Sequence, residues 1–322
     1  MRIARTLGEV PPAPDGRILA IGNFDGVHRG HRAIVGAAVA RAREMGIECA
    51  VLTFHPHPVT VLRPDHPHDM LTTFEDKADQ FRLLGVDRVI CLNFDPAFAA
   101  QTPHRFAKAV LAPLAAREIY VGANYKFGVN QSGHVDTLEE LGRTHGFAVH
   151  PQTTYTLDGE RVSSSRTRAA LKAGDVARAA ELLGRPYAVK GLVVAGAARG
   201  RGLGYPTANL ELPEELVPAD GVYAARVAVW DAIGPDAAPS APKPAIVYIG
   251  TRPTFDGTGR LIEVHLLDET LNLYGHRIRV DFVERVRGEM GFAGPDALTA
   301  QIARDVARAR QVLAREAGMG AA

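Results

Sequence analysis

Two histidines stand in the segment GNFDGVHRGH, residues 22–31, which lies between a short apolar run and an amphipathic one. His28 and His31 are three residues apart, so on a helical turn their side chains share a face and can both reach one phosphate group. Imidazole suits this task because it donates to negative charge and exchanges protons near pH 7. The glycines of the segment allow a ligand to approach the backbone, and a helix start offers unpaired N–H groups to an anion. These residue types predict a phosphate site, with surface imidazoles or a metal-binding pair as alternatives.

A second segment with possible chemistry is RGRGLGYPTANL, residues 199–210. It contains no P-loop of the form GxxxxGK[ST], so any phosphate chemistry there would need a different solution. Taken alone, the segment is typical of a turn that enters a strand. A third candidate is Glu263 in LIEVHLLD, where Ile262 and Val264 flank the carboxylate. The alternation puts Glu263 on the face opposite to theirs but does not say which face is inside.

The elements that must position the first segment alternate between strand and helix. Short apolar strands are predicted at residues 17–22, 47–54, 87–94 and 117–122, with amphipathic helices between them. Such alternation favours right-handed crossovers and a parallel sheet. Ligands of these sheets bind beyond the carboxyl ends of the strands. The first histidine segment follows the first strand at such an end.

The second half of the chain has a different pattern. After two short helices that end near residue 185, β-rich runs occupy residues 187–290 with turn residues between them and no helical crossovers. This pattern favours an antiparallel barrel or sandwich, and a helix closes the chain. We therefore predict an α/β domain over residues 1–185 and an antiparallel β-barrel domain with a C-terminal helix over residues 186–322.

The composition of the chain limits which partners and which cellular compartment are expected. Of 322 residues, 37 are basic and 36 acidic, so a net charge of +1 gives no field that would favour nucleic acid. There is no run of 18 apolar residues and no apolar secretory leader, so we expect neither a membrane span nor export. Cys49 and Cys91 sit in apolar runs and are expected to be reduced core residues. We expect a cytoplasmic protein, monomeric or transiently self-associating, that acts on small molecules.

The motifs of the first half resemble a known enzyme family. HxGH after a first strand is similar to the signature of the nucleotidyltransferase superfamily, whose members join a nucleophile to the α-phosphorus of a nucleotide. The longer GNFDGVHRGH resembles the FAD synthetase module of prokaryotic bifunctional flavin enzymes. Three further motifs match that module in order, namely TFHPHP (53–58), VGANYKFGVNQSG (121–133) and RVSSSRTR (161–168). The resemblance implies a Rossmann-like nucleotidyltransferase domain.

The same resemblance implies roles for individual residues. His28 and His31 would act catalytically at the α-phosphorus. The residues implied in binding ATP are Gly22, Phe24, Asp25, Asn124, Arg161, Ser164, Ser165 and Arg168, and those implied in binding flavin are His57, Pro58 and Tyr125. Two positions depart from the family pattern, with Ser165 in place of Thr and Thr167 in place of Ile. Serine keeps the hydroxyl, so we expect activity to be retained.

The second half resembles riboflavin kinases. GYPTAN matches their G-x-P-T-A-N motif, and LIEVHLLD matches their E-x-H-L-[LI]-D strand. The resemblance implies that Thr207 and Asn209 bind the Mg²⁺ of MgATP and that Glu263 is the general base for the ribityl 5′-hydroxyl; hydroxyl and amide oxygens suit this ion. Gly202, Gly204 and Pro206 would lie at the phosphates. Tyr248, in YIGTRPTFDG, stands where the family has Asn.

Together these resemblances predict a bifunctional enzyme of flavin cofactor biosynthesis. The C-terminal domain would phosphorylate riboflavin with ATP to FMN, and the N-terminal domain would adenylylate FMN with ATP to FAD and release pyrophosphate, with Mg²⁺ on the phosphates. One alternative is an FAD synthetase with an inactive or flavin-sensing kinase domain, for which Tyr248 is the support. Another is a nucleotidyltransferase for a different phosphate.

Overall fold

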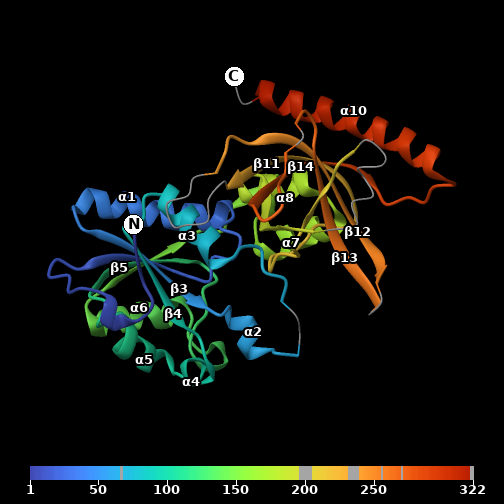
Figure 1. Ribbon diagram of the computed structural model, residues 1–322. Coiled ribbons are helices and arrows are strands. Elements are labelled where there is room, and N and C mark those ends of the chain that lie inside the picture. The colour runs from blue at the N-terminus through green and yellow to red at the C-terminus, as the bar shows by residue number, and fades with distance from the viewer. Residues whose placement is uncertain (66–67, 196–204, 231–238, 255–256, 270, 320–322) are drawn as a thin grey trace. The chain divides into compact units, whose positions relative to one another are not determined.

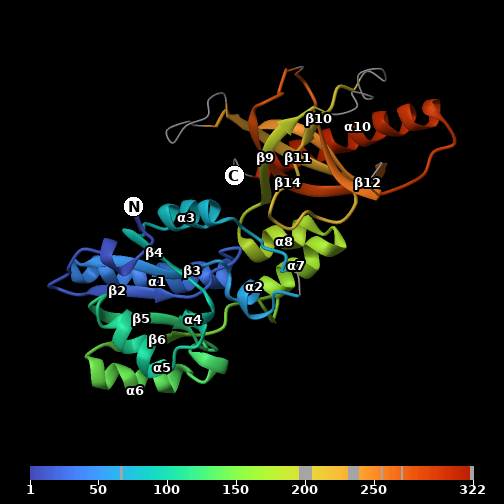
Figure 2. The same cartoon turned by 60° about the horizontal axis from the view of Figure 1, so that its bottom comes forward.

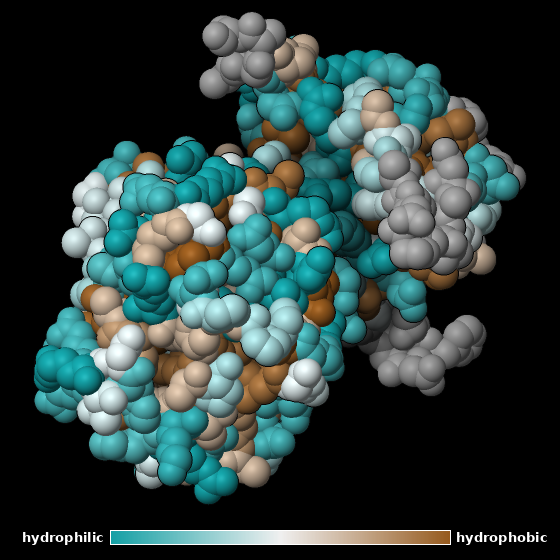
Figure 3. Space-filling view, turned by 90° about the vertical axis from the view of Figure 1, so that its left-hand side faces the viewer, coloured by the Kyte–Doolittle hydropathy of each residue, from teal (hydrophilic) through white to brown (hydrophobic). Residues whose placement is uncertain are grey.

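The computed structural model describes residues 1–65, 68–195, 205–230, 239–254, 257–269 and 271–319 (Figure 1). The chain forms two compact units, Met1–Ser164 and Ser165–Ala322. In the described parts, no helix is both long and apolar enough to cross a membrane. On the face in view of the N-terminal unit, apolar side chains are interspersed with polar ones (Figure 3).

The first unit is built on a six-stranded sheet in which all neighbouring strands are parallel. Its strands are β1 (Arg2–Ala4), β2 (Arg17–Ile21), β3 (Glu48–His55), β4 (Arg88–Asn93), β5 (Ala116–Gly122) and β6 (Ala148–Gln152). Their order in the sheet is β1-β4-β3-β2-β5-β6. From β2 the chain builds outward to β3 and β4, and then returns to add β5 and β6 on the other side. The order therefore reverses between β2 and β5, where parallel α/β sheets bind their ligands.

Helices cover both faces of this sheet (Figure 2). The helices of this unit are α1 (Arg29–Met45), α2 (Pro58–Leu62), α3 (Phe74–Leu83), α4 (Pro96–Ala99), α5 (Pro103–Phe106) and α6 (Val135–His145), with a π-helical turn at Ala107–Leu111 after α5. Side chains alternate along β2, so Ile18 and Ala20 pack with α1 and α3, whereas Leu19 and Ile21 pack with α5 and α6. Both faces are buried, which explains why the strands are continuous apolar runs.

The second unit is a closed antiparallel barrel with the strand order β10-β13-β12-β11-β14-β9. Its strands are β9 (Tyr187–Val194), β10 (Ala208–Leu210), β11 (Gly221–Trp230), β12 (Lys243–Thr254), β13 (Gly257–Leu266) and β14 (Arg277–Gly288). Two helices precede the barrel, α7 (Ser164–Ala173) and α8 (Val176–Leu183). The short strand β10 closes the barrel by pairing with both β9 and β13.

The last helix, α10 (Pro295–Met319), packs on the outside of the barrel. Its buried residues Ala309, Val312 and Leu313 form one apolar cluster with Val222 and Ala224 of β11. Tyr223, which lies between these two residues on β11, is fully buried and points into the barrel interior. The barrel strands next to α10 are therefore buried on both faces.

The predicted parallel sheet, antiparallel barrel and C-terminal helix are confirmed. The edge strands β1 and β6 were not predicted from the sequence. β1 has only three residues, and β6 contains Pro151 and no fully buried residue, so neither forms an apolar run. The structure groups α7 and α8 with the barrel, because the compact units meet at Ser164 and Ser165.

Candidate active sites

The histidine segment forms a tight loop between the end of β2 and the start of α1. Phe24 and Val27 have positive φ angles of 51° and 39°, and Gly26 has 81°. The ring of Phe24 folds back over Gly22, where a Cβ would lie 3.1 Å from the nearest ring carbons. Any larger residue at position 22 would displace this ring. The loop therefore depends on glycine at the point where the backbone leaves the sheet.

His28 is the N-cap of α1, and its Nδ1 accepts a hydrogen bond of 3.2 Å from the backbone N–H of His31. Because Nδ1 accepts, the proton of the neutral ring is on Nε2. The two imidazoles stack with centroids 3.5 Å apart and planes inclined by 17°. A Cβ on Gly30 would lie 3.2 Å from Cε1 of His28. The glycine of HRGH thus makes room for this ring. The two histidines are paired as predicted, but His28 is the extended N-cap residue and not part of the helical turn.

His31 has an apolar and electropositive environment. Phe24 packs edge-on against its ring at 5.2 Å, and its Nδ1 is buried without a hydrogen-bond partner among the described residues. Burial lowers the pKa of His31 well below its ordinary value of 6.5, and the nearby His28 and Lys77 lower it further. The ring is therefore neutral at pH 7.

Asp25, predicted to bind ATP, is buried and hydrogen-bonded within the protein. Its carboxylate accepts from the backbone N–H of Leu71 at 3.0 Å and from the hydroxyl of Thr72 at 3.4 Å, and Thr72 in turn accepts from Gly26 N–H at 3.1 Å. These bonds tie the histidine loop to the chain just before α3. The hydroxyl of Ser164 donates to the backbone carbonyl of Asp25 at 2.9 Å.

Lys77 on α3 was missed by the sequence analysis. Its side chain is 2% exposed, and its Nζ donates to the backbone carbonyl of Asn23 at 3.2 Å. Burial lowers the pKa of this ammonium group, whereas the charge of Asp25 raises it. In the sequence, Lys77 stands among the charged residues of FEDKADQF and is indistinguishable from a surface lysine. In the structure, Lys77 instead holds the histidine loop through its hydrogen bond to Asn23.

Asn124 and Tyr125 follow the carboxyl end of β5, on the other side of the switch point from β2. Asn124 is exposed, whereas Tyr125 stacks on Phe127 with centroids 5.5 Å apart. Burial raises the pKa of the Tyr125 phenol. Tyr125 and Phe127 adjoin an aromatic cluster, with ring centroids 5.4–6.1 Å apart, formed by Phe54, Phe94, Phe98 and Phe106. The sequence analysis did not identify this cluster, although Phe54 ends the predicted second strand.

The other predicted flavin contacts lie after β3. His57 is 8% exposed and caps α2, with Nδ1 accepting from Val59 N–H at 3.3 Å. Its ring stacks on His68 at 4.6 Å. Pro58 is the first residue of α2. Both residues thus stand at the carboxyl end of β3, the strand next to β2.

The fourth motif spans the two compact units. Arg161 is exposed on a short hairpin, β7 (Thr156–Leu157) and β8 (Glu160–Arg161), in the first unit. Ser165 and Arg168 belong to the second unit, on α7. Thr167, which departs from the family pattern, is fully buried. Within the first unit, the structure brings Ser164 to the histidine loop.

In the barrel, two of the predicted kinase residues and Tyr248, which departs from the family pattern, are neighbours across the strands. Asn209 of β10 is paired with Glu263 of β13, and Glu263 is paired with Tyr248 of β12. Paired residues of antiparallel strands point to the same face. Ile262 and Val264 are buried in the barrel interior, so Glu263 points outward. Alternation in the sequence did not show whether Glu263 faces inward or outward. The structure places Glu263 on the outer face of the barrel, and Asn209 lies on the same face.

Tyr248 lies beside Glu263 on that face. Its hydroxyl donates to Oε1 of Glu289 at 2.9 Å, and its ring lies so close over Gly250 that a Cβ there would clash with it. Pro206, just before β10, accepts a 2.8 Å hydrogen bond through its carbonyl from Nδ1 of His265. The predicted phosphate contacts Gly202 and Gly204 lie outside the described residues.

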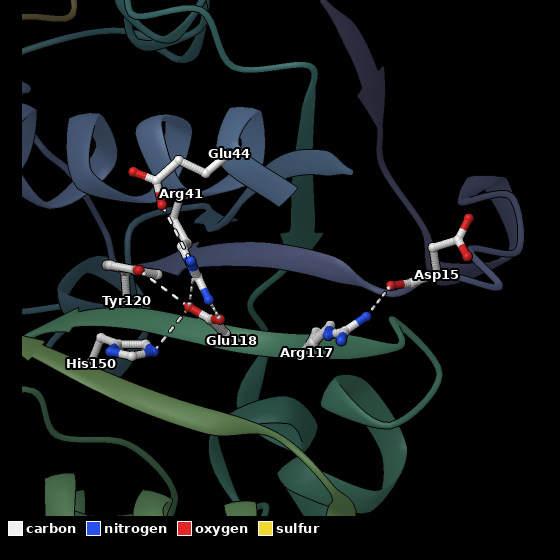
Figure 4. Close-up of polar contacts among 7 residues, drawn as sticks. All are labelled: Asp15, Arg41, Glu44, Arg117, Glu118, Tyr120 and His150. Carbon is white, nitrogen blue, oxygen red and sulfur yellow. Dashed lines mark hydrogen bonds and ion pairs between the residues drawn. The ribbon is translucent and has the colours of Figure 1, made fainter. Parts of the chain in front are cut away.

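A further polar cluster lies away from these residues, between α1, β5 and β6 (Figure 4). The carboxylate of Glu118 accepts two hydrogen bonds of 3.0 Å from Arg41 and one of 3.3 Å from the Tyr120 hydroxyl. Nε2 of His150 lies 3.0 Å from Glu118 Oε2, without the geometry of a hydrogen bond. Glu118 stands near the amino end of β5, and Arg41 is on the last turns of α1. The cluster thus lies at the opposite end of these elements from the histidine pair.

Comparison with known proteins identifies both halves of the chain. Residues 10–166 match the family model of FAD synthetase, and residues 183–313 match that of riboflavin kinase. The bifunctional riboflavin kinase/FMN adenylyltransferase of Escherichia coli (strain K12) is 38% identical over 313 residues, 97% of each chain. Its namesake in Bacillus subtilis (strain 168) is 36% identical over 294 residues, 89% of this chain and 90% of the relative.

One solved structure, described as a macrolide-efflux protein from Streptococcus pneumoniae, has a TM-score of 0.85 at 29% identity and covers 96% of this chain and 98% of its own. Both family models occur in the order that the motifs predict. The chain therefore belongs to the family of bifunctional riboflavin kinase/FMN adenylyltransferases, which make FMN from riboflavin and FAD from FMN.

Proposed function

We propose that the stacked pair His28 and His31 stabilises the α-phosphoryl group of ATP while the phosphate of FMN attacks it in line and expels pyrophosphate. The observation that carries this proposal is the position of both rings at the start of α1, beyond the carboxyl end of β2. The cap fixes the proton of His28 on Nε2, which can donate to a developing negative charge. No covalent enzyme intermediate is needed, because positioning and charge stabilisation suffice.

We propose that the nucleotide and the flavin meet where the strand order reverses. Gly22 and Phe24 at the end of β2 and Asn124 after β5 would contact ATP, together with Arg161, Ser164, Ser165 and Arg168. Asp25 would act there through the loop that its carboxylate holds. His57, Pro58 and Tyr125 would contact the flavin. Tyr125, Phe94 and Phe98 are only partly buried, and they support this assignment because an isoalloxazine ring stacks favourably on aromatic side chains.

For the kinase step, we propose that Glu263 takes the proton of the ribityl 5′-hydroxyl and that Asn209 and Thr207 hold the Mg²⁺ of MgATP. The pairing of Asn209 with Glu263 on the outer face supports this proposal, because it supplies hard oxygen donors at one place. The described residues contain no group of three or more His, Cys, Asp and Glu that could hold a metal, so this site would rely on amide, hydroxyl and phosphate oxygens. When bound, Mg²⁺ would neutralise charge on the transferred phosphoryl group.

We further propose that the functional boundary between the activities lies near residue 185, since the two family models end at 166 and begin at 183. The enzyme would act in the cytoplasm on free small molecules, as a monomer or a transient assembly. The net charge of +1 supports the expectation that nucleic acid is not a partner.

Chromatography of flavins tests these assignments directly. The purified chain is incubated with riboflavin, ATP and Mg²⁺, and FMN and FAD are followed over time. We expect FMN first and FAD after it. If riboflavin is unchanged while FMN, supplied in a second incubation, becomes FAD, the kinase assignment fails. Tyr248→Asn would then be the first variant to test. If riboflavin is converted but FMN accumulates, the histidine assignment fails.

A further inference from the structure

His265 lies on β13 two residues after Glu263, so both side chains point to the outer face of the barrel. Its Nδ1 is 2.8 Å from the backbone carbonyl oxygen of Pro206. A carbonyl oxygen only accepts, so Nδ1 carries the proton and donates it. The ring of Tyr205 packs edge-on against the imidazole, with centroids 5.5 Å apart and planes inclined by 80°. One histidine thus contacts two consecutive residues of the segment that enters β10.

This contact lies at the point where the strand ladder begins. The register of β10 starts at Ala208, which pairs with Val264, and continues with Asn209 opposite Glu263. Thr207 comes before that first pair, so the ladder sets the position of Asn209 more directly than that of Thr207. Pro206 has no N–H to donate, and its carbonyl is the group that His265 holds.

We propose that His265 is a positioning residue of the kinase site, which fixes the Tyr205–Thr207 segment so that the Thr207 hydroxyl stays in register with Asn209 and Glu263. The inference rests on the proposed roles of these three residues. His265 would not touch substrate. It acts through the Pro206 carbonyl, one residue before Thr207, and from the same strand as the proposed base.

The chemistry of the contact provides a conservative variant. Nδ1 is the ring nitrogen nearer to the backbone, and the amide nitrogen of asparagine is at a similar distance from Cα. His265→Asn therefore keeps a donor toward Pro206, whereas His265→Ala removes both the donor and the ring beside Tyr205. His276 supplies a matched control, because its Nδ1 lies 3.2 Å from the backbone carbonyl of Trp230 in the same barrel. His276→Ala removes a similar bond at another place.

The experiment measures FMN formation and hydrogen exchange on the full chain. For His265→Ala we expect KM for MgATP to rise about tenfold, as for the loss of one hydrogen bond, with a smaller change in kcat. We also expect faster amide exchange in the peptide that covers residues 205–210, measured without nucleotide. His265→Asn should restore most of both properties, and His276→Ala should alter neither. FAD formation from supplied FMN, measured on the same molecules, should be unchanged in all three variants.

Two results would overturn the inference: unchanged KM and exchange in His265→Ala, or equal defects in the Ala and Asn variants. Thr207→Ala and Glu263→Gln are measured in parallel to separate this outcome from failure of the proposed site. If these two variants lose FMN formation while His265→Ala behaves as the unaltered protein, only the role of His265 is wrong. If they retain FMN formation, the proposed kinase site itself is wrong.

Discussion

The imidazole of His28 lies flat against that of His31, with their centroids 3.5 Å apart. Nδ1 of His28 also accepts a hydrogen bond from the backbone N–H of His31. The helix cap and the candidate catalytic pair are therefore one arrangement. Two protonated rings at this distance would repel each other, and the low pKa of His31 avoids that charge. This geometry separates the structural role of His28, at Nδ1, from its proposed chemical role, at Nε2.

Replacing His28 by Asn tests that separation. Asn is among the best N-cap residues, so His28→Asn should keep α1 capped while removing the Nε2–H donor. We expect FAD formation from supplied FMN to fall by about 10²–10⁴-fold, the range for loss of an acid–base group, with FMN formation unchanged. His28→Ala should lose the same activity and also about 1 kcal/mol of stability. An unaltered FAD rate in the Asn variant would exclude the catalytic role.

The protonation of His31 gives a second prediction. Its pKa is well below 6.5 in the folded protein and ordinary when unfolded, so the unfolded chain takes up the proton first as pH falls. The stability associated with the neutral ring is thus complete above pH 6.5 and is lost as pH falls toward the lowered pKa. We expect the NMR signals of His31, assigned with His31→Asn, to stay at neutral-imidazole positions through pH 6.5. Titration near 6.5 would contradict the buried environment.

Lys77 can be tested for a role in holding the histidine loop. Lys77→Met keeps a long side chain but removes the hydrogen bond to the Asn23 carbonyl. The charge of Asp25 acts on Lys77 in the folded protein, and removing one charge of a buried pair usually destabilises a protein. We therefore expect slower FAD formation, by about tenfold if one hydrogen bond to the loop is lost, together with a lower unfolding temperature. FMN formation, measured on the same molecules, should be unchanged, and loss of both activities would instead indicate a general folding defect.

How far the sequence predicts the sites depends on the distance over which each contact forms. His28 and His31 are three residues apart, so a local contact, the N-cap bond at the start of α1, pairs them. Lys77 reaches the loop only because α3 packs beside α1, which no local pattern indicates. Likewise, Glu263 and Asn209 meet through barrel register, and alternation cannot tell the inner face from the outer one. The apolar runs predicted both sheets, but the edge strand β6 lacked such a run.

Glu263→Gln tests the division of labour between the two units. Glutamine keeps the shape of the side chain on the outer face, but its amide cannot take up a proton. We expect FMN formation to fall by about 10²–10⁴-fold while FAD formation from supplied FMN continues at its normal rate. Tyr248→Asn, on the neighbouring strand, serves as a comparison that leaves the carboxylate in place. Loss of both activities in Glu263→Gln would refute the assignment.

Glu118 provides a prediction about acid stability. Hydrogen bonds from Arg41 lower the pKa of its carboxyl below the ordinary value of 4.5, so in acid the unfolded chain binds the proton first. The ionised group therefore stabilises the first unit fully above pH 4.5, and this contribution is lost as pH falls through the lowered pKa. Glu118→Gln should lower the free energy of unfolding near pH 7, with a smaller further loss in acid than the unaltered chain shows.

Glu44 provides the matched control for Glu118, because its carboxylate also contacts Arg41, at 3.2 Å, but its side chain is 66% exposed against 10% for Glu118. Exposed ion pairs contribute about 0–1 kcal/mol, so Glu44→Gln should change stability little at any pH. The unaltered protein, Glu118→Gln and Glu44→Gln are unfolded in urea at pH 7 and at pH 4, with hydrogen exchange of the β5 amides as the readout. This measures the change in stability and its pH dependence in the first unit. Identical pH dependence in the Glu118→Gln and unaltered proteins would show that the Arg41 contact does not hold the carboxylate ionised. A contact that stabilises the ionised carboxylate must weaken when the carboxylate is protonated, and this loss would appear only in the unaltered protein.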